Sequence, residues 1–370
     1  MLLDRPPRSV CLVRLSALGD TCHTVAVLRA LQAAWPDTAF TWVIGAAEHR
    51  LIQLVDGVRF VTFDKRRMLP ELLRIRAELR GQRFDLLLHM QLSFRASLVA
   101  ALVRSPLRLG FDRARARELQ WLFTNREITP RRREHVLDGL MGFAYACGVV
   151  AGPPLWRVPL PEPARAYAER IASGAARLLL LSPCSSHPQR NWHARGYAAA
   201  VDHAAQVHGM RVVLVGGRSA LEAQVGAEIE ALATTGPLNQ IGKDTLPELL
   251  ALMARADGLI TPDSGPAHMA TMVGLPVIGL YAATNPARSG PYLSRALCVD
   301  RYAEAALIQR GRTPDELDWM TKIERPGVMD LVTVPDVLAR IDALPCNGPM
   351  AAASGGGATL AQDVVRRDRG

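Results

Sequence analysis

The sequence predicts an α/β protein with two domains, each built on a parallel sheet that helices cover on both faces. Two observations predict this class. Short apolar runs alternate with helical patterns in both halves of the chain, which is the order that produces parallel sheets. The runs at residues 10–15 and 178–181 are almost continuously apolar, which is typical of strands buried on both faces. The length of 370 residues suits two domains of roughly 150 residues each.

The N-terminal half begins with a predicted strand over residues 10–15. A loop containing Gly19 follows, and then a helical pattern over residues 21–34. Further strands are expected at residues 40–44 and 85–89. We therefore predict a first domain over residues 1–155.

The C-terminal half repeats the alternation. Strands are expected at residues 177–182, 211–215, 258–261 and 277–281, and helices at residues 196–208, 246–255 and 266–273. Residues 151–163 are rich in proline, which suits an extended linker. We expect a second domain over residues 164–330, a C-terminal helix over 331–346 and a disordered tail over 347–370. Two Rossmann-like domains would then face each other across a cleft.

Composition excludes several classes of protein. A chain that is 49% hydrophobic and 21% charged has enough apolar surface to fold, so it is not disordered. No apolar run approaches the roughly 18 residues of a membrane helix, and the first residues do not read as a signal peptide. The six cysteines are scattered and form no CxxC pair. We expect a cytoplasmic protein without a disulfide framework or a bound metal.

The positive charge is concentrated in the N-terminal half. Residues 1–150 carry 23 Lys and Arg against 14 Asp and Glu, whereas the rest of the chain carries 21 of each. Basic runs such as Lys65, Arg66 and Arg67 indicate an anionic partner: a membrane surface, a phosphorylated substrate or nucleic acid. Aromatic residues that would stack on bases are sparse, so nucleic acid is the weakest of the three. The alternative is an ordinary solvated surface.

Polar residues follow the first strand at the point where a helix begins. Ser16, Gly19, Asp20, Thr21 and His23 lie in or just after this loop. Ligands bind at the carboxyl ends of strands in an open parallel sheet. Asp20 is either an N-terminal cap of the helix or a general base that takes a proton from a substrate hydroxyl.

A similar turn follows the predicted strand over residues 258–261. Asp263, Ser264 and Gly265 precede a helix that contains His268. Backbone amides at a helix N-terminus bind phosphate, although ordinary capping explains the same residues.

A third polar loop, with Ser185, Ser186 and Arg190, follows the first strand of the second half. Its serines can donate to phosphate oxygens, and the arginine can bind a diphosphate with two N–H groups, or else it is a surface loop. No G-x-S-x-G motif and no strand-linked G-x-G-x-x-G motif occur, which disfavours a serine hydrolase and a dinucleotide oxidoreductase.

Together, three segments resemble glycosyltransferase family 9, the bacterial heptosyltransferases. They are RLSALGDTCHTVAVLRAL, SPCSSHPQRNW and LITPDSGPAHMATMVGLPVIGLYAATNPARSGPY, and the resemblance covers about residues 8–345. It implies the GT-B fold, with the acceptor on the N-terminal domain and a nucleotide-sugar on the C-terminal domain. The implied reaction is an inverting transfer, without a protein-bound metal or cofactor, from ADP-heptose to the Kdo region of lipopolysaccharide at the inner-membrane surface.

The resemblance also implies residue roles. Asp20 would be the general base, and Arg190 would neutralise the leaving diphosphate. The donor would be held by Ser185, Ser186, Glu222, Asp244, Thr245, Leu246, Asp263, Ser264, Gly265 and His268. The acceptor would be held by Ser16, Gly19, Thr21, His23, Lys65, Arg66 and Arg67.

The chain departs from the family pattern at one site position and in two segments. Arg190 stands where the family often has lysine, and the two side chains bind phosphate with different geometry. Residues 315–329 and the tail suggest no role. Two alternatives stay open: a GT-B transferase or 2-epimerase that uses another nucleotide-sugar, and a binding module that performs no chemistry.

Overall fold

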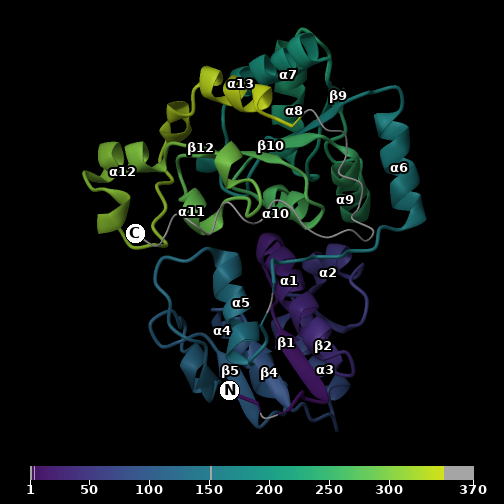
Figure 1. The fold of residues 1–370 in the computed structure, drawn as a ribbon, viewed down its shortest axis with the longest axis vertical. Coiled ribbons are helices and arrows are strands. Elements are labelled where there is room, and N and C mark those ends of the chain that lie inside the picture. Colours follow the sequence, from purple (N-terminus) through teal and green to yellow (C-terminus); the bar gives the residue numbers. More distant parts are fainter. Residues whose placement is uncertain (1, 4, 151, 346–370) are drawn as a thin grey trace.

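The computed structural model describes residues 2–3, 5–150 and 152–345. These residues form two six-stranded sheets, one in each half of the chain, with helices around each (Figure 1). The strand pairs within both sheets are parallel. The predicted α/β class with two parallel sheets is therefore confirmed.

The N-terminal sheet has the strand order β3-β2-β1-β4-β5-β6. Its strands are β1 (Ser9–Val13), β2 (Ala39–Gly45), β3 (Arg59–Phe63), β4 (Leu86–His89), β5 (Leu107–Gly110) and β6 (Arg126–Glu127). Its helices are α1 (Leu18–Ala34), α2 (Ala46–Ile52), α3 (Met68–Glu78), α4 (Phe94–Leu102) and α5 (Val136–Ala146), with a 3-10 turn at Gln120–Leu122.

The C-terminal sheet has the order β12-β11-β10-β7-β8-β9. Its strands are β7 (Leu178–Leu181), β8 (Arg211–Leu214), β9 (Leu238–Asn239), β10 (Gly258–Pro262), β11 (Val277–Tyr281) and β12 (Val299–Asp300). Its helices are α6 (Glu162–Ala172), α7 (Ala194–His208), α8 (Ala220–Leu232), α9 (Leu246–Arg255), α10 (Gly265–Met272), α11 (Pro286–Ser289), α12 (Tyr302–Arg310) and α13 (Val334–Asp342). Short 3-10 helices lie at Pro188–Arg190, Arg295–Leu297, Pro314–Glu316 and Val328–Leu331.

The strands that the sequence predicts most clearly are the central ones. β1 lies between β2 and β4, and β7 lies between β10 and β8. The four residues of β7 are fully buried, as their unbroken run of leucine predicts. Helix α1 begins at Leu18, three residues earlier than expected, and the Asp20 carboxylate accepts a 3.4 Å hydrogen bond from the Ala17 amide at its start.

The linker between the sheets runs along helix α1. The Trp156 indole N–H donates to the Cys22 carbonyl at 2.9 Å, and Arg29 donates to the Trp156 carbonyl at 3.0 Å. Helix α6 begins at Glu162, so the helix replaces the last two residues of the expected linker. The expected C-terminal helix is the shorter α13, and the expected tail over 347–370 lies outside the described residues.

The two domains share apolar packing. One buried cluster runs from Val25 on α1 through Leu137 on α5 to Leu250 on α9 and Met269 on α10. Burial of this kind contributes about 25 cal/mol per Å² of apolar surface, so the cluster holds the domains against each other. Among the described residues, no helix combines the length and the hydrophobicity that a bilayer crossing requires.

Candidate active site

The three polar loops lie at the two topological switch points of the sheets. In the N-terminal sheet the strand order reverses between β1 and β4, and in the C-terminal sheet it reverses between β7 and β10. Ligands of open α/β sheets bind beyond the carboxyl ends of the strands at such points. The loop with Asp20 follows β1, the loop with Arg190 follows β7, and the turn with Asp263 follows β10.

The N-termini of α1 and α10 meet where the two domains join. A Cβ atom placed on Gly19 would lie 2.3 Å from Cδ2 of His268, which is too close for any real side chain. A Cβ on Gly265 would lie 3.3 Å from Leu18. Glycine at position 19 is therefore what allows α1 to approach the His268 ring.

The Asp20 side chain is oriented by Arg14 from the end of β1. The two groups form an ion pair through Asp20 Oδ2, and the same oxygen accepts the Ala17 amide. Arg14 is buried, with 10% of its side chain exposed, and also donates to the Met90 carbonyl at 2.5 Å. Asp20 keeps 32% of its side chain exposed. The carboxylate thus has one fixed oxygen and remains accessible from the junction.

Three histidines pack together at the junction. The ring centroid of His23 lies 4.6 Å from that of His268 and 5.5 Å from that of His135. Burial lowers the pKa of all three, that of His135 to about 3. His135 bonds to the Gly290 carbonyl at 2.9 Å across the domains, whereas both ring nitrogens of His23 are buried without a partner. The three histidines are therefore neutral at pH 7, and they help to hold the two domains together.

Arg190 lies between two carboxylates on the C-terminal side. Its guanidinium donates to Glu324 Oε1 from Nε at 2.8 Å and from Nη2 at 2.5 Å, and its Nη1 lies 3.3 Å from Asp263 Oδ2. Burial raises the pKa of Glu324, but the hydrogen bond and charge of Arg190 outweigh it and hold that pKa below its usual range. Because only 14% of Arg190 is exposed, the guanidinium is held in one place.

The backbone amides in the first turn of α10 receive no hydrogen bond from a capping side chain. Ser264 is the residue before the helix, but its hydroxyl bonds to Thr261 at 2.8 Å and does not cap the helix. Ser185 is buried in the neighbouring loop, where its amide donates to Asn191 at 2.7 Å, and Ser186 is exposed. Unsatisfied amides at a helix N-terminus form a ready anion site.

Glu222 follows β8 and Asp244 follows β9, two strands that lie on the far side of β7 from β10 and the α10 turn. Ser219 caps α8 and Glu222 completes this capping box, while the Glu222 carboxylate also accepts the Gly217 amide at 2.6 Å. Burial raises the pKa of Asp244 to about 7, and its Oδ2 is buried without a partner. Thr245 caps α9 through Glu248, and Leu246 is the first residue of that helix. Asp244 is thus the group of this region with unused hydrogen-bonding capacity.

The residues assigned to the acceptor do not gather in one place. Ser16 accepts from Gln91 at 3.2 Å beside Asp20. Thr21 is buried and its hydroxyl bonds to its own helix, while His23 belongs to the histidine cluster. Lys65, Arg66 and Arg67 are exposed beyond β3, at the edge of the sheet.

Sequence reasoning did not identify Arg14, which pairs with Asp20, or Glu324, which pairs with Arg190. Arg14 lies inside an apolar strand pattern, and only the fold shows that it meets Asp20. Glu324 belongs to residues 315–329, for which the sequence suggested no role. In the structure this segment links the domains, since the Trp319 indole donates to the Glu134 carbonyl at 2.8 Å.

Two parallel α/β domains joined at the carboxyl edges of their sheets form the GT-B fold of glycosyltransferases. A solved family 9 glycosyltransferase from Veillonella parvula superposes with a TM-score of 0.77 at 21% identity, covering 91% of this chain and 96% of that one. The E. coli heptosyltransferase WaaC, solved with ADP-2-deoxy-2-fluoro heptose, superposes at 0.64 with 19% identity, covering 82% and 100%.

Sequence comparison identifies the family. The model for glycosyltransferase family 9 (heptosyltransferase) matches residues 72–319. The lipopolysaccharide core heptosyltransferase OpsX of Haemophilus influenzae is 36% identical over 343 residues, covering 93% of this chain and 99% of that protein. The chain belongs to glycosyltransferase family 9 and is an enzyme of the heptosyltransferase type, as its motifs predicted.

Proposed function

We propose that this enzyme transfers a heptose from ADP-heptose to the Kdo region of the lipopolysaccharide inner core, with inversion and without a metal ion. The observation that carries the proposal is that α1, with Asp20 in its first turn, meets the N-terminus of α10, while Arg190 contacts Asp263 just before α10. The relative from H. influenzae is named as a lipopolysaccharide core heptosyltransferase, and the E. coli neighbour was solved with an ADP-heptose analogue. Both support this choice of substrates.

The donor side supplies the positive charge that a leaving diphosphate requires. The open amides of α10 face the phosphates, and Arg190 binds an oxygen once the diphosphate displaces its contact with Asp263. Preorganised donors of this kind stabilise charge that develops in the transition state, typically by about 3–4 kcal/mol each. We propose that this arrangement takes the place of a metal ion. Asp244 is available to the nucleoside.

The acceptor side supplies the base. Asp20 accepts the proton of an acceptor hydroxyl through Oδ1, because Oδ2 is held by Arg14. The hydroxyl oxygen attacks the anomeric carbon, the new glycosidic bond forms, and the bond from that carbon to the diphosphate oxygen breaks with its electron pair going to ADP. A single displacement from the opposite face inverts the anomeric centre. Positioned general bases of this type contribute about 10²–10⁴-fold.

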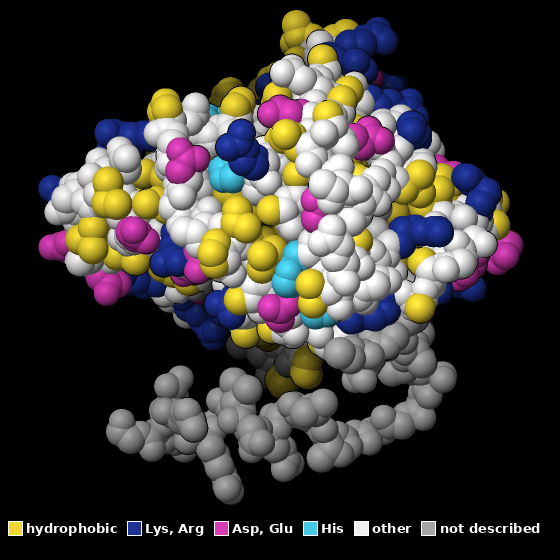
Figure 2. All heavy atoms as spheres, turned by 90° about the horizontal axis from the view of Figure 1, so that it is seen from above, with side chains coloured by type: hydrophobic (Ala, Val, Ile, Leu, Met, Phe, Trp, Pro, Cys, Tyr) yellow, Lys and Arg dark blue, Asp and Glu magenta, His cyan; other side chains and the backbone are white. Residues whose placement is uncertain are grey.

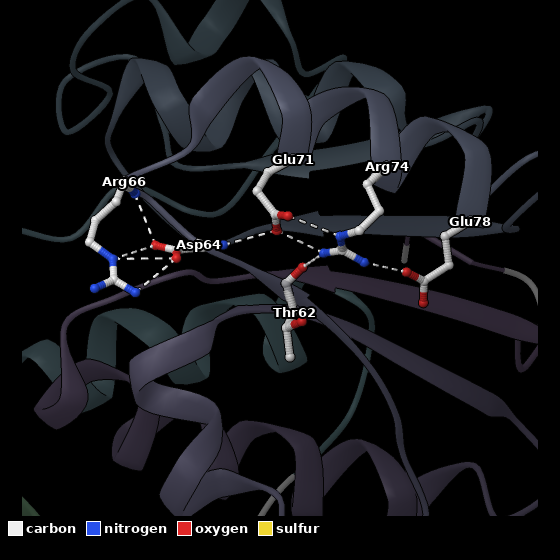
Figure 3. A network of polar contacts seen from close by, with 6 residues as sticks. All are labelled: Thr62, Asp64, Arg66, Glu71, Arg74 and Glu78. Atoms are coloured by element: carbon white, nitrogen blue, oxygen red, sulfur yellow. Dashed lines mark hydrogen bonds and ion pairs between the residues drawn. The ribbon is translucent and has the colours of Figure 1, made fainter.

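Helix α3 supplies a surface for the membrane that carries a lipid-linked acceptor. Its inner face is fixed to β3, since Arg74 bonds to the Thr62 carbonyl and to two glutamates of its own helix (Figure 3). On its outer face Leu69 and Leu73, one turn apart, are 73% and 67% exposed. Exposed leucines beside basic residues are typical of helices that lie on anionic membranes.

The basic run beside α3 is only partly neutralised within the protein. Arg66 pairs with Asp64, and that hydrogen bond lowers the pKa of Asp64 to about 2 (Figure 3). Lys65 and Arg67 are exposed on either side. We therefore assign this run to phosphate groups at the membrane surface, not to the reacting sugar.

The test is a donor panel with a delipidated Kdo acceptor in the presence of EDTA. Release of ADP from ADP-heptose, dependent on acceptor and unchanged by EDTA, is expected, while UDP- and GDP-sugars should not react. Turnover with another nucleotide-sugar would replace the donor, and loss of turnover in EDTA would overturn metal independence. Binding of ADP-heptose without turnover on any inner-core acceptor would favour the binding-module alternative.

A further inference from the structure

A second cluster of chemistry-bearing side chains lies far from the junction, between α7 and α13. His203 and His208 on α7 and Asp342 on α13 bring three potential metal-ligand atoms within 4.8 Å of one another. Both Nε2 atoms lie 2.7 Å from the same oxygen, Oδ1 of Asp342. The two helices lie side by side at the end of the C-terminal domain that is remote from the N-terminal domain (Figure 1). The catalytic chemistry uses none of these residues.

We propose that His203, His208 and Asp342 form a binding site for a divalent transition-metal ion, with zinc as the ion that fits best. Two imidazole nitrogens and one carboxylate oxygen are preferred zinc ligands, and three protein ligands with one water form a standard open zinc site. When they ligate a metal, two imidazoles and one carboxylate together carry one negative charge, which suits a dication.

The two distances from Asp342 to the imidazole nitrogens require only a small adjustment. Zinc bonds of about 2.0–2.2 Å in a tetrahedral site separate neighbouring ligand atoms by about 3.3 Å, so Asp342 must withdraw by about 0.6 Å from each nitrogen. Asp342 is the last residue of α13 and 52% of its side chain is exposed, so it can move. His203 and His208 are 20% and 22% exposed, which leaves room for a water ligand.

All three side chains of the cluster reach solvent. The side chains of His203, His208 and Asp342 are 20%, 22% and 52% exposed. Figure 2, which looks onto the C-terminal domain from above, shows histidine side chains reaching the surface among scattered acidic and basic groups. The ion would therefore enter directly from solvent.

A bound ion would connect α13, the last described helix, to α7. Asp342 lies more than 130 residues from both histidines in the chain, so the ion would join distant segments. An ion that binds the folded chain and not the unfolded one raises the stability of the fold by mass action. Because the site is remote from Asp20 and Arg190, its occupancy should leave the transfer rate unchanged.

The experiment uses the full chain freed of metal, titrated with Zn²⁺ in a calorimeter, with visible absorption of the Co²⁺ form as a second readout. One ion per chain is expected, with an absorption spectrum of four-coordinate Co²⁺ and a Tm that rises by a few degrees with Zn²⁺. His208→Gln and Asp342→Asn should each lose the Co²⁺ spectrum and the Tm shift. His49→Ala, a histidine change on α2 of the other domain, should retain both.

Two outcomes overturn the proposal. Absence of stoichiometric binding to the wild-type chain would show that the three side chains form a hydrogen-bonded cluster only. Binding that survives both variants would place the ion elsewhere. The same variants should transfer heptose at the wild-type rate, so failure of the transferase proposal would appear in a different assay.

Discussion

Replacing Gly19 with alanine tests the close approach of α1 to α10. The added methyl carbon would lie 2.3 Å from the His268 ring, at least about 1.1 Å inside an ordinary contact distance of 3.4 Å. Neither helix can yield easily, because both take part in the apolar cluster that joins the domains. Overpacking of this kind costs about 1–3 kcal/mol.

The assay is urea and thermal unfolding of Gly19→Ala beside the wild type. A loss of about 1–3 kcal/mol in the free energy of unfolding is expected, with a fall in Tm of about 2–4 °C for each kcal/mol. The matched control is Gly152→Ala in the linker, where a new Cβ meets no atom within 4 Å. Its stability should stay near that of the wild type.

The double variant Gly19→Ala, His268→Ala locates the cause. Removing the ring makes room for the methyl group, so the double variant should be more stable than the sum of the single changes predicts, by about 0.5–3 kcal/mol. Heptosyl transfer should remain low, because the family resemblance assigns His268 to the donor. If the effects of the two changes simply add, or if the Gly19→Ala protein is as stable as the control, the close approach of α1 to the His268 ring is refuted.

Three further predictions concern charge. Arg190→Gln should lower kcat by about 10²–10³-fold in a steady-state transfer assay, while the surface change Arg83→Gln should not; equal rates would remove Arg190 from catalysis. Burial raises the pKa of Asp244 to about 7 from an ordinary value near 3.9, so the folded state binds the extra proton and stability falls as pH rises between about 4 and 7. Asp244→Asn should therefore gain stability over the wild type as pH rises from 4 to 8 in urea unfolding, and a pH-independent difference would contradict this. Leu73→Glu should reduce co-sedimentation with anionic phospholipid vesicles yet leave turnover of a delipidated acceptor intact, whereas Leu307→Glu on α12 should bind vesicles normally.

The sequence was sufficient for the central strands and for the loops that follow them. Strands β1, β7, β10 and β11 are mostly apolar and almost fully buried, so the sequence marks them clearly between polar loops. Short edge strands such as β6 and β9 have two residues each and are partly exposed, so no periodicity marks them. Their place is determined by neighbours in the sheet.

The site was predictable where residues are adjacent in sequence and not where distant segments meet. Asp20 and Asp263 follow strands directly, so their position at a sheet edge is implied by the strand pattern. The partners of these residues come from elsewhere. Glu324 reaches Arg190 across 134 residues, and Asp342 reaches His208 across the same separation. Only the folded chain brings such pairs together.

The role of Asp20 is the central claim, and the exchange of its carboxylate for an amide tests it most directly. Asp20→Asn preserves size and leaves the donor site untouched, so ADP should bind in calorimetry as it does to the wild type. Single-turnover transfer of heptose should fall by about 10²–10⁴-fold, the usual contribution of a positioned base, while the surface change Asp37→Asn should have no effect. A transfer rate in Asp20→Asn within a few-fold of the wild type would contradict the assignment of Asp20 as the base.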